Sequence, residues 1–183
     1  SPFSMRVRTV VSEIFEDLAR NTSFEGVIYH DDITLSDFED AHPDALATYR
    51  SWGLPDAVAD IRANDDTLGR WTVLKINALD QFASEVSSTV RRYKPSLITA
   101  RNLYAQVAIN PRAEVWYAQA LENSLANYDF TAIMAMPYME QASDPIAFQK
   151  RILSGIGRFP SARNRIVFEL QTVDWRYNQK PIP

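Results

Sequence analysis

Short apolar strands alternate with amphipathic helical patterns along the whole chain, and this order limits the folds that it can adopt. The strand-like runs are rich in β-branched residues, and the longer segments between them repeat apolar residues at helical spacing. Such an order is typical of βα units that build a parallel sheet. The predicted strands are residues 25–30, 96–101, 130–136 and 165–171. The predicted helices are residues 5–20, 36–51, 69–93, 111–126 and 144–156, with residues 56–68 irregular.

The length of the chain limits how much of a barrel it can form. Its 183 residues suit one domain. A complete (β/α)8 barrel takes about 250 residues, whereas about four βα units are visible here. We therefore predict an α/β fold that is part of a (β/α)8 TIM-type barrel, with residues 1–183 forming a single domain that is a fragment of that barrel.

Composition excludes several classes of function. The net charge of −4 and the pI of about 5.2 argue against nucleic-acid binding through phosphate contacts. No apolar run of about 18 residues is present, so we expect no transmembrane segment. The chain has no cysteine, which excludes disulfides and thiolate metal sites and suits cytoplasm and periplasm equally. No signal-peptide pattern, glycine-rich phosphate loop or G-x-S-x-G motif occurs, and we predict no cofactor.

The first predicted strand runs directly into the most acidic stretch of the chain. Ligands bind at the carboxyl ends of strands in parallel α/β folds. Glycoside hydrolysis needs two carboxyl groups, one protonated and one ionised, and crowded like charges help to create such a pair. Asp31 and Asp32 follow the strand directly, where a purely structural role would favour Gly or Asn. The acids of this stretch are Asp31, Asp32, Asp37, Glu39, Asp40 and Asp44.

Some of these acids have simpler interpretations. Ser36 and Glu39 fit the S-x-x-E capping box of a helix start, so Glu39 could be only a cap. Asp44 fits a solvated acid on the same predicted helix. His30 with the two aspartates after it could hold a hard cation. With only two histidines and no H-x-x-x-H spacing in the chain, however, we predict no metal site.

Polar and aromatic residues also follow or close the other strands, where aromatic rings could stack on the faces of sugar rings. Trp116 and Trp175 could equally be packing residues. Glu169, on the fourth strand, either forms a salt bridge, with Arg101 as one partner, or faces substrate. The residues concerned are Arg101, Asn102, Tyr104, Tyr138, Glu140, Glu169, Asp174 and Trp175.

Several sequence blocks resemble one bacterial family. The stretch from His30 to Asp40, H-D-D-x-x-L-S-D-F-E-D, is similar to the C-terminal domain of the poly-β-1,6-N-acetyl-D-glucosamine deacetylases of the PgaB type. Further similar blocks follow in order at successive strand ends, and together they span nearly the whole chain. These blocks are residues 99–102, 126–129, 134–140 and 168–175.

The resemblance implies a glycoside-hydrolase-type barrel that binds partially de-N-acetylated poly-β-1,6-N-acetyl-D-glucosamine and cleaves it internally. It also implies an N-terminal deacetylase domain in the full-length protein and a Gram-negative periplasmic location, with outer-membrane association as an open alternative. A non-catalytic domain that holds the polymer for export is the rival hypothesis. The candidate catalytic residues are Asp31, Asp32 and Asp37, followed by Glu39 and Asp40. The candidate substrate-binding residues are His30, Arg101, Asn102, Tyr104, Trp116, Tyr138, Glu140, Glu169, Asp174 and Trp175.

Overall fold

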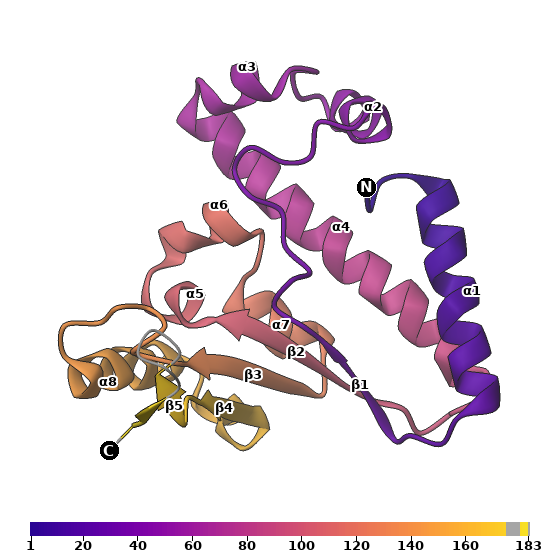
Figure 1. The fold of residues 1–183 in the computed structure, drawn as a ribbon. Coiled ribbons are helices and arrows are strands. Elements are labelled where there is room, and N and C mark those ends of the chain that lie inside the picture. Colours follow the sequence, from indigo (N-terminus) through magenta and orange to yellow (C-terminus); the bar gives the residue numbers. More distant parts are fainter. Residues whose placement is uncertain (175–179, 183) are drawn as a thin grey trace.

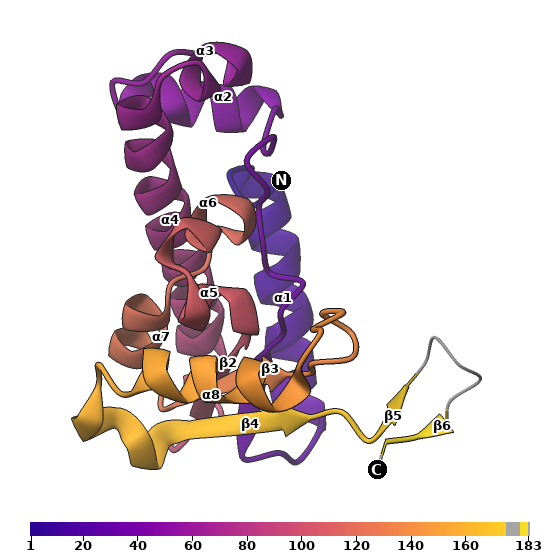
Figure 2. The same ribbon diagram turned by 90° about the vertical axis from the view of Figure 1, so that its left-hand side faces the viewer.

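A four-stranded parallel sheet with the order β1-β2-β3-β4 organises the molecule, and helices pack against one of its faces (Figures 1 and 2). The computed structural model describes residues 1–174 and 180–182. The parallel pairing confirms the predicted α/β class and all four predicted strands. These are β1 (Gly26–Tyr29), β2 (Ile98–Tyr104), β3 (Phe130–Ala135) and β4 (Ile166–Leu170). A small antiparallel pair follows, β5 (Val173–Asp174) with β6 (Lys180–Pro181).

One helix precedes the first strand, and the others connect successive strands. The side chain of Asp144 caps the helix predicted from residue 144, and that of Asn64 caps the long helix, each accepting a backbone N–H bond of 3.0 Å. The long helix begins at Asp65 instead of residue 69, and a short helix occupies residues 58–62, so the prediction that residues 56–68 are irregular was wrong. The α-helices are α1 (Met5–Asn21), α2 (Pro43–Ser51), α3 (Val58–Arg62), α4 (Asp65–Arg91), α5 (Ala105–Ile109), α6 (Glu114–Tyr117), α7 (Leu121–Asn127) and α8 (Pro145–Ile156). Two 3-10 helices are η1 (Pro111–Ala113) and η2 (Pro160–Arg165).

The helix predicted from Ser36 was wrong at its start, because α2 begins at Pro43. The S-x-x-E pattern forms only part of a capping box. The backbone N–H of Ser36 donates to Glu39 Oε2, at 3.0 Å, but the Ser36 hydroxyl accepts from Phe38 N–H and no helix follows. The true cap is His42, whose Nδ1 accepts from the backbone N–H of Asp44. Residues 36–42 are therefore a loop.

The helix predicted over residues 111–126 is broken into η1, α6 and α7. The break lies at Ala118, whose φ of 47° places it in the left-handed region and ends α6. The second strand runs three residues further than predicted, to Tyr104. Asn102 and Tyr104 consequently lie within β2, together with Arg101, instead of after it. Because side chains alternate along a strand, neighbouring residues among them point to opposite faces of the sheet.

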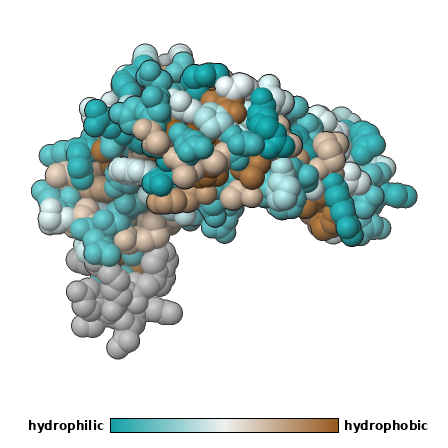
Figure 3. Space-filling view, turned by 90° about the horizontal axis from the view of Figure 1, so that it is seen from above, coloured by the Kyte–Doolittle hydropathy of each residue, from teal (hydrophilic) through white to brown (hydrophobic). Residues whose placement is uncertain are grey.

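The core lies between β2, β3 and the helices over them. Leu103 and Ile133 pack with Phe148 and Ile152 of α8, and all four are almost fully buried. β1 and β4 form the two edges of this sheet. Brown apolar patches interrupt the hydrophilic surface in Figure 3, in keeping with the exposure of many large apolar side chains. Exposed examples on α1, β4 and α8 are Met5, Val7, Val10, Ile14, Leu18, Phe168, Leu170, Ile146 and Leu153.

No helix in the described part of the chain is long and apolar enough to cross a membrane.

Close packing of α8 against α5 generates a stability prediction. A Cβ added at Gly155 would meet the backbone oxygen of Ala108 at 2.0 Å, whereas one added at Gly69 of α4 would meet nothing within 4 Å. We expect Gly155→Ala to lower the free energy of unfolding by about 1–3 kcal/mol through overpacking. The matched variant Gly69→Ala should raise it by about 0.5–1 kcal/mol. Denaturant unfolding measures both. Equal stability of the two variants would contradict the α5–α8 packing.

Candidate functional site

The parallel sheet brings the predicted strand-end residues to one edge. His30, Asp31 and Asp32 follow β1, Tyr104 closes β2, and residues 138 and 140 follow β3. Since all four strands run in the same direction, their carboxyl ends meet at this edge. Trp175, which was predicted to join them, lies outside the described residues.

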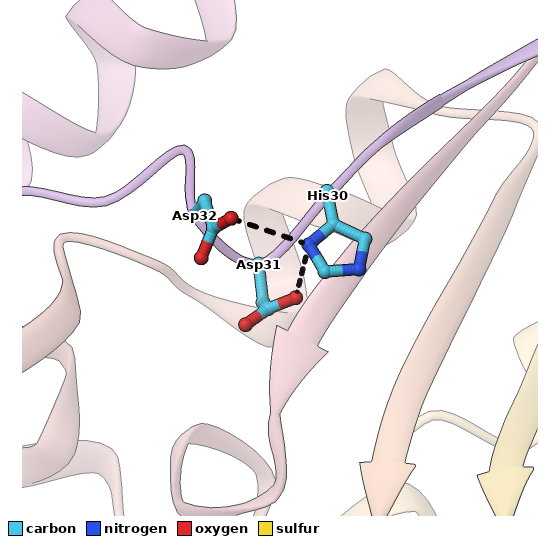
Figure 4. Close-up of side chains that lie close together, drawn as sticks. All are labelled: His30, Asp31 and Asp32. Carbon is cyan, nitrogen blue, oxygen red and sulfur yellow. Dashed lines mark ion pairs between the residues drawn. The ribbon is translucent and has the colours of Figure 1, made fainter.

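The sequence His30-Asp31-Asp32 lies at the end of β1, on one side of this row of strand ends (Figure 4). The Nδ1 atom of His30 lies 2.5 Å from Asp31 Oδ1 and 3.8 Å from Asp32 Oδ2. The two aspartates differ in surroundings: Asp31 is buried, whereas the side chain of Asp32 is 87% exposed. One potential ligand atom from each of the three residues lies within 4.8 Å of the others. They could therefore offer three ligand atoms to a cation, the alternative that the sequence left open.

Arg101 holds the backbone of this segment. Its guanidinium donates to the carbonyl oxygens of Tyr29, His30 and Ile33. Arg101 is buried, and the register with Tyr29 places it on the face covered by α4. The carboxylate of Asp80 on α4 offsets part of its charge. Arg101 therefore positions the loop after β1 through three hydrogen bonds from its buried guanidinium, and its predicted contact with substrate stays a prediction.

The suggested ion pair between Arg101 and Glu169 does not form. Glu169 lies on the opposite face of the sheet, where its Oε2 accepts a hydrogen bond of 2.7 Å from Asn102 Nδ2. The reason is the alternation of β2, in which neighbours point to opposite faces. Asn102 and Glu169 thus share the face that the helices leave open.

Gln119 is a buried residue of this edge that sequence reasoning missed. Its Nε2 donates to the backbone oxygen of Asp31 at 3.0 Å, and its Oε1 accepts from the backbone N–H of Tyr104 at 3.1 Å. One amide side chain therefore connects the end of β2 to Asp31. The left-handed turn at Ala118 precedes it directly, and no local pattern in the sequence predicts that turn.

Tyr104 faces Asp31 from the end of β2. Its ring stacks on Tyr117 of α6, with centroids 4.4 Å apart. Burial raises the pKa of the Tyr104 phenol to about 12, and a hydrogen bond to Asp31 together with the charges of Asp31 and Asp32 adds to the rise. The phenol therefore stays protonated near neutral pH and can donate a hydrogen bond to Asp31.

The other predicted acids form a separate group further along the loop. Asp37 makes an ion pair of 3.0 Å with Arg62 of α3. Glu39 accepts from the backbone N–H of Ser36, and Asp40 Oδ1 accepts from that of His42. These carboxylates are occupied by an arginine or by backbone amides, unlike that of Asp32.

The remaining predicted residues lie at the far side of the same edge. Tyr138 lines a cavity of about 440 Å³ together with Pro137 and Gln171, between the ends of β3 and β4. Glu140 accepts a hydrogen bond of 2.9 Å from Gln106 of α5. Asp174 is buried in β5, and Trp116 on α6 is half exposed.

The parallel α/β sheet with acids at the carboxyl ends of its strands is an arrangement found in β/α-barrel proteins, and comparison with known proteins gives its family. The chain belongs to hypothetical glycosyl hydrolase family 13, whose model matches residues 1–183. It is also similar to the solved PgaB (BpsB) glycoside hydrolase domain from Bordetella bronchiseptica, at 43% identity with a TM-score of 0.94. That match covers 100% of this chain and 52% of the other, and it confirms the predicted partial (β/α)8 TIM-type barrel.

Two curated relatives carry the name poly-beta-1,6-N-acetyl-D-glucosamine N-deacetylase, from Escherichia coli strain K12 and from Escherichia coli O157:H7. Each is 39% identical over 181 residues, which is 97% of this chain. The chain spans 27% of the length of each relative. These matches confirm the family resemblance that the sequence blocks indicated.

The bridge made by Gln119 generates a second stability prediction. Gln119→Leu should leave the buried backbone oxygen of Asp31 and N–H of Tyr104 without partners, at about 1–3 kcal/mol for each group. The matched control is Gln81→Leu, because Gln81 is exposed and makes only a surface hydrogen bond of 3.3 Å. It should change the free energy of unfolding by less than about 0.5 kcal/mol. Chemical denaturation decides, and equal effects of the two changes would show that the bridge is not stabilising.

Proposed function

We propose that this chain is part of an endo-acting glycoside hydrolase that cleaves partially de-N-acetylated poly-β-1,6-N-acetyl-D-glucosamine during processing of the biofilm matrix. The observation that carries the proposal is the adjacent pair Asp31 and Asp32 at the carboxyl ends of the strands, in a chain of a glycosyl hydrolase family. The names of the relatives support this polymer as the substrate.

The chemistry follows from the unlike surroundings of the two carboxyl groups. Glycoside hydrolysis needs one group that donates a proton to the leaving oxygen and one that acts as a base, a nucleophile or a stabilising charge. Asp31 is buried beside the Tyr104 phenol, and Asp32 is exposed to an incoming substrate. Asp37, Glu39 and Asp40 complete the proposed catalytic set as negative charges on the same loop. Together these acids attract the cationic amines of deacetylated glucosamine units.

The proposal extends to partners and location. The relatives are named deacetylases and are longer than this chain, which supports an N-terminal deacetylase domain in the full-length protein. We place the protein in the Gram-negative periplasm, where the polymer is processed before export. Trp116, which is half exposed, and Tyr138, which lines the cavity between the ends of β3 and β4, are proposed to contact sugar rings. His30, Asn102, Glu140, Glu169 and Asp174 are proposed as further polar contacts.

A non-catalytic polysaccharide-binding domain is the second candidate, and one observation favours it. Asp37 is held by Arg62, and Glu39 and Asp40 are held by backbone amides. Carboxylates engaged in this way still attract amines electrostatically, but they are poorly placed to donate or accept protons during a reaction.

Asparagine variants separate the two candidates. In the full-length protein, Asp31→Asn and Asp32→Asn should each lower polymer cleavage about 10²–10⁴-fold, because Asn can neither donate a carboxyl proton nor act as a carboxylate. The matched control is Asp17→Asn, which changes an exposed acid near the C-terminal end of α1. The chain continues from this end of α1 into the start of β1, so Asp17 is remote from the carboxyl ends of the strands. Product analysis by mass spectrometry measures cleavage. Cleavage at the wild-type rate by both Asp31→Asn and Asp32→Asn would overturn the catalytic assignment. Binding of the polymer by the wild type without any cleavage would favour the binding domain.

Salt dependence tests the electrostatic part of the proposal. Affinity for partially deacetylated oligosaccharides should fall as NaCl rises from about 0.05 to 0.5 M, because salt screens the attraction between amines and carboxylates. Fully acetylated oligosaccharides carry no amine and should show little salt dependence. Isothermal titration calorimetry gives both affinities, and equal salt dependence would argue against an amine-binding acidic edge.

A further inference from the structure

Lys75 is a fully buried lysine that lies beneath the acidic loop. It projects from α4 and has no exposed surface. Its Nζ donates to the backbone oxygen of Ser36 at 2.6 Å and to that of Glu39 at 2.9 Å. The ammonium also lies 3.6 Å from the centroid of the Trp71 ring, within range of a cation–π contact. One side chain therefore fastens both ends of the segment 36–39 to α4.

The charges around Lys75 come from several elements. The carboxylates of Asp37, Glu39 and Asp40 on the loop all interact electrostatically with the ammonium. From α3, Arg62 adds a positive charge that is paired with Asp37. From α2, the Tyr49 hydroxyl accepts from the backbone N–H of Asp40.

One carboxylate oxygen of the loop remains buried without a hydrogen bond. It is Oδ2 of Asp40, whose other oxygen accepts from His42 N–H. Lys75 interacts electrostatically with this carboxylate, so its removal would affect the loop through the lost charge as well as through the loss of two hydrogen bonds.

We propose that Lys75 is a positioning residue that holds the loop Ser36–Asp40 in the shape that presents its acids and Phe38 to the amine-bearing polymer. This inference rests on the proposed function, because the polymer is the ligand that the loop would meet. Phe38 is 61% exposed, with its ring over the Arg62 guanidinium at 3.6 Å, so the loop carries an outward aromatic surface beside its carboxylates. A purely packing residue at this buried helix position would be apolar.

The protonation of Lys75 gives the proposal a pH signature. Burial lowers the pKa of Lys75 to about 7, although the three loop carboxylates oppose this shift. As pH rises through this value, the neutral amine keeps N–H donors but loses the charge that attracts the carboxylates and the Trp71 ring. The grip on the loop should therefore weaken above about pH 7.

Global stability should respond in the opposite direction. Between the folded pKa of about 7 and the ordinary value of 10.5, the unfolded chain binds the proton that the folded chain has released. The Lys75 contribution to the free energy of unfolding therefore rises with pH in this range. A loop that loosens while the protein becomes no less stable separates positioning from general unfolding.

The experiment compares Lys75→Met and Lys75→Arg with Lys150→Met, an exposed lysine on α8, in the full-length protein. Hydrogen exchange measures protection of the amides of residues 36–40 between pH 6 and 8.5, without polymer. Protection in the wild type should fall toward that of Lys75→Met as pH rises. Lys75→Arg should keep its protection, because a guanidinium stays charged. At pH 6, Lys75→Met should bind partially deacetylated oligosaccharide at least tenfold more weakly, and Lys150→Met should match the wild type.

Each outcome bears on a different statement. Equal, pH-independent protection in the wild type and Lys75→Met would overturn the proposal, as would a loosened loop with unchanged affinity. If neither variant folds, the pH dependence of wild-type protection still decides. If the wild type neither binds nor cleaves the polymer, the proposed function fails, while hydrogen exchange still shows whether Lys75 orders the loop.

Discussion

The guanidinium of Arg101 is the interaction on which the acidic edge depends. From the second strand it donates to three backbone oxygens of the turn after the first, and so fixes where the chain leaves the sheet. Gln119 fixes the same turn from the other side by bonding the backbone oxygen of Asp31. A buried cation can hold this position because the carboxylates of Asp80 and Asp31 face it. The pair Asp31–Asp32 is thus carried by backbone that cannot shift freely.

The acids of one continuous loop serve two arrangements. Asp31 and Asp32 lie at the strand end, with one buried and one exposed. The later acids lie where the loop crosses the N-terminal half of α4, and Lys75 holds them there. Figure 1 shows this loop running from β1 along α4 toward α2 and α3. One stretch of sequence therefore supplies both the proposed catalytic pair, Asp31 and Asp32, and the group of negative charges at Asp37, Glu39 and Asp40.

The strands and the shared edge were predictable because alternation of strands and helices dictates parallel pairing. The face of the sheet to which each side chain points was not predictable. Parallel strands are covered on both faces, so the sequence gives no sign of the face on which Arg101 lies. The turn at Ala118 was missed because nothing local marks a left-handed alanine, and Gln119 was missed with it. In the sequence, Lys75 fits a solvent-facing position of an amphipathic helix. Only the tertiary fold shows that the loop at residues 36–40 covers this side chain.

The most direct test of the central claim is a crystal structure of the full-length protein with a β-1,6-linked oligosaccharide that contains both acetylated and free amino sugars. We expect the sugar chain to cross the carboxyl ends of the strands, with a glycosidic oxygen within hydrogen-bond distance of Asp31 or Asp32 and an amine near the loop at residues 36–40. An oligosaccharide bound elsewhere, such as in the cavity of about 660 Å³ beside Trp52 and the N-terminal part of α4, would contradict the account.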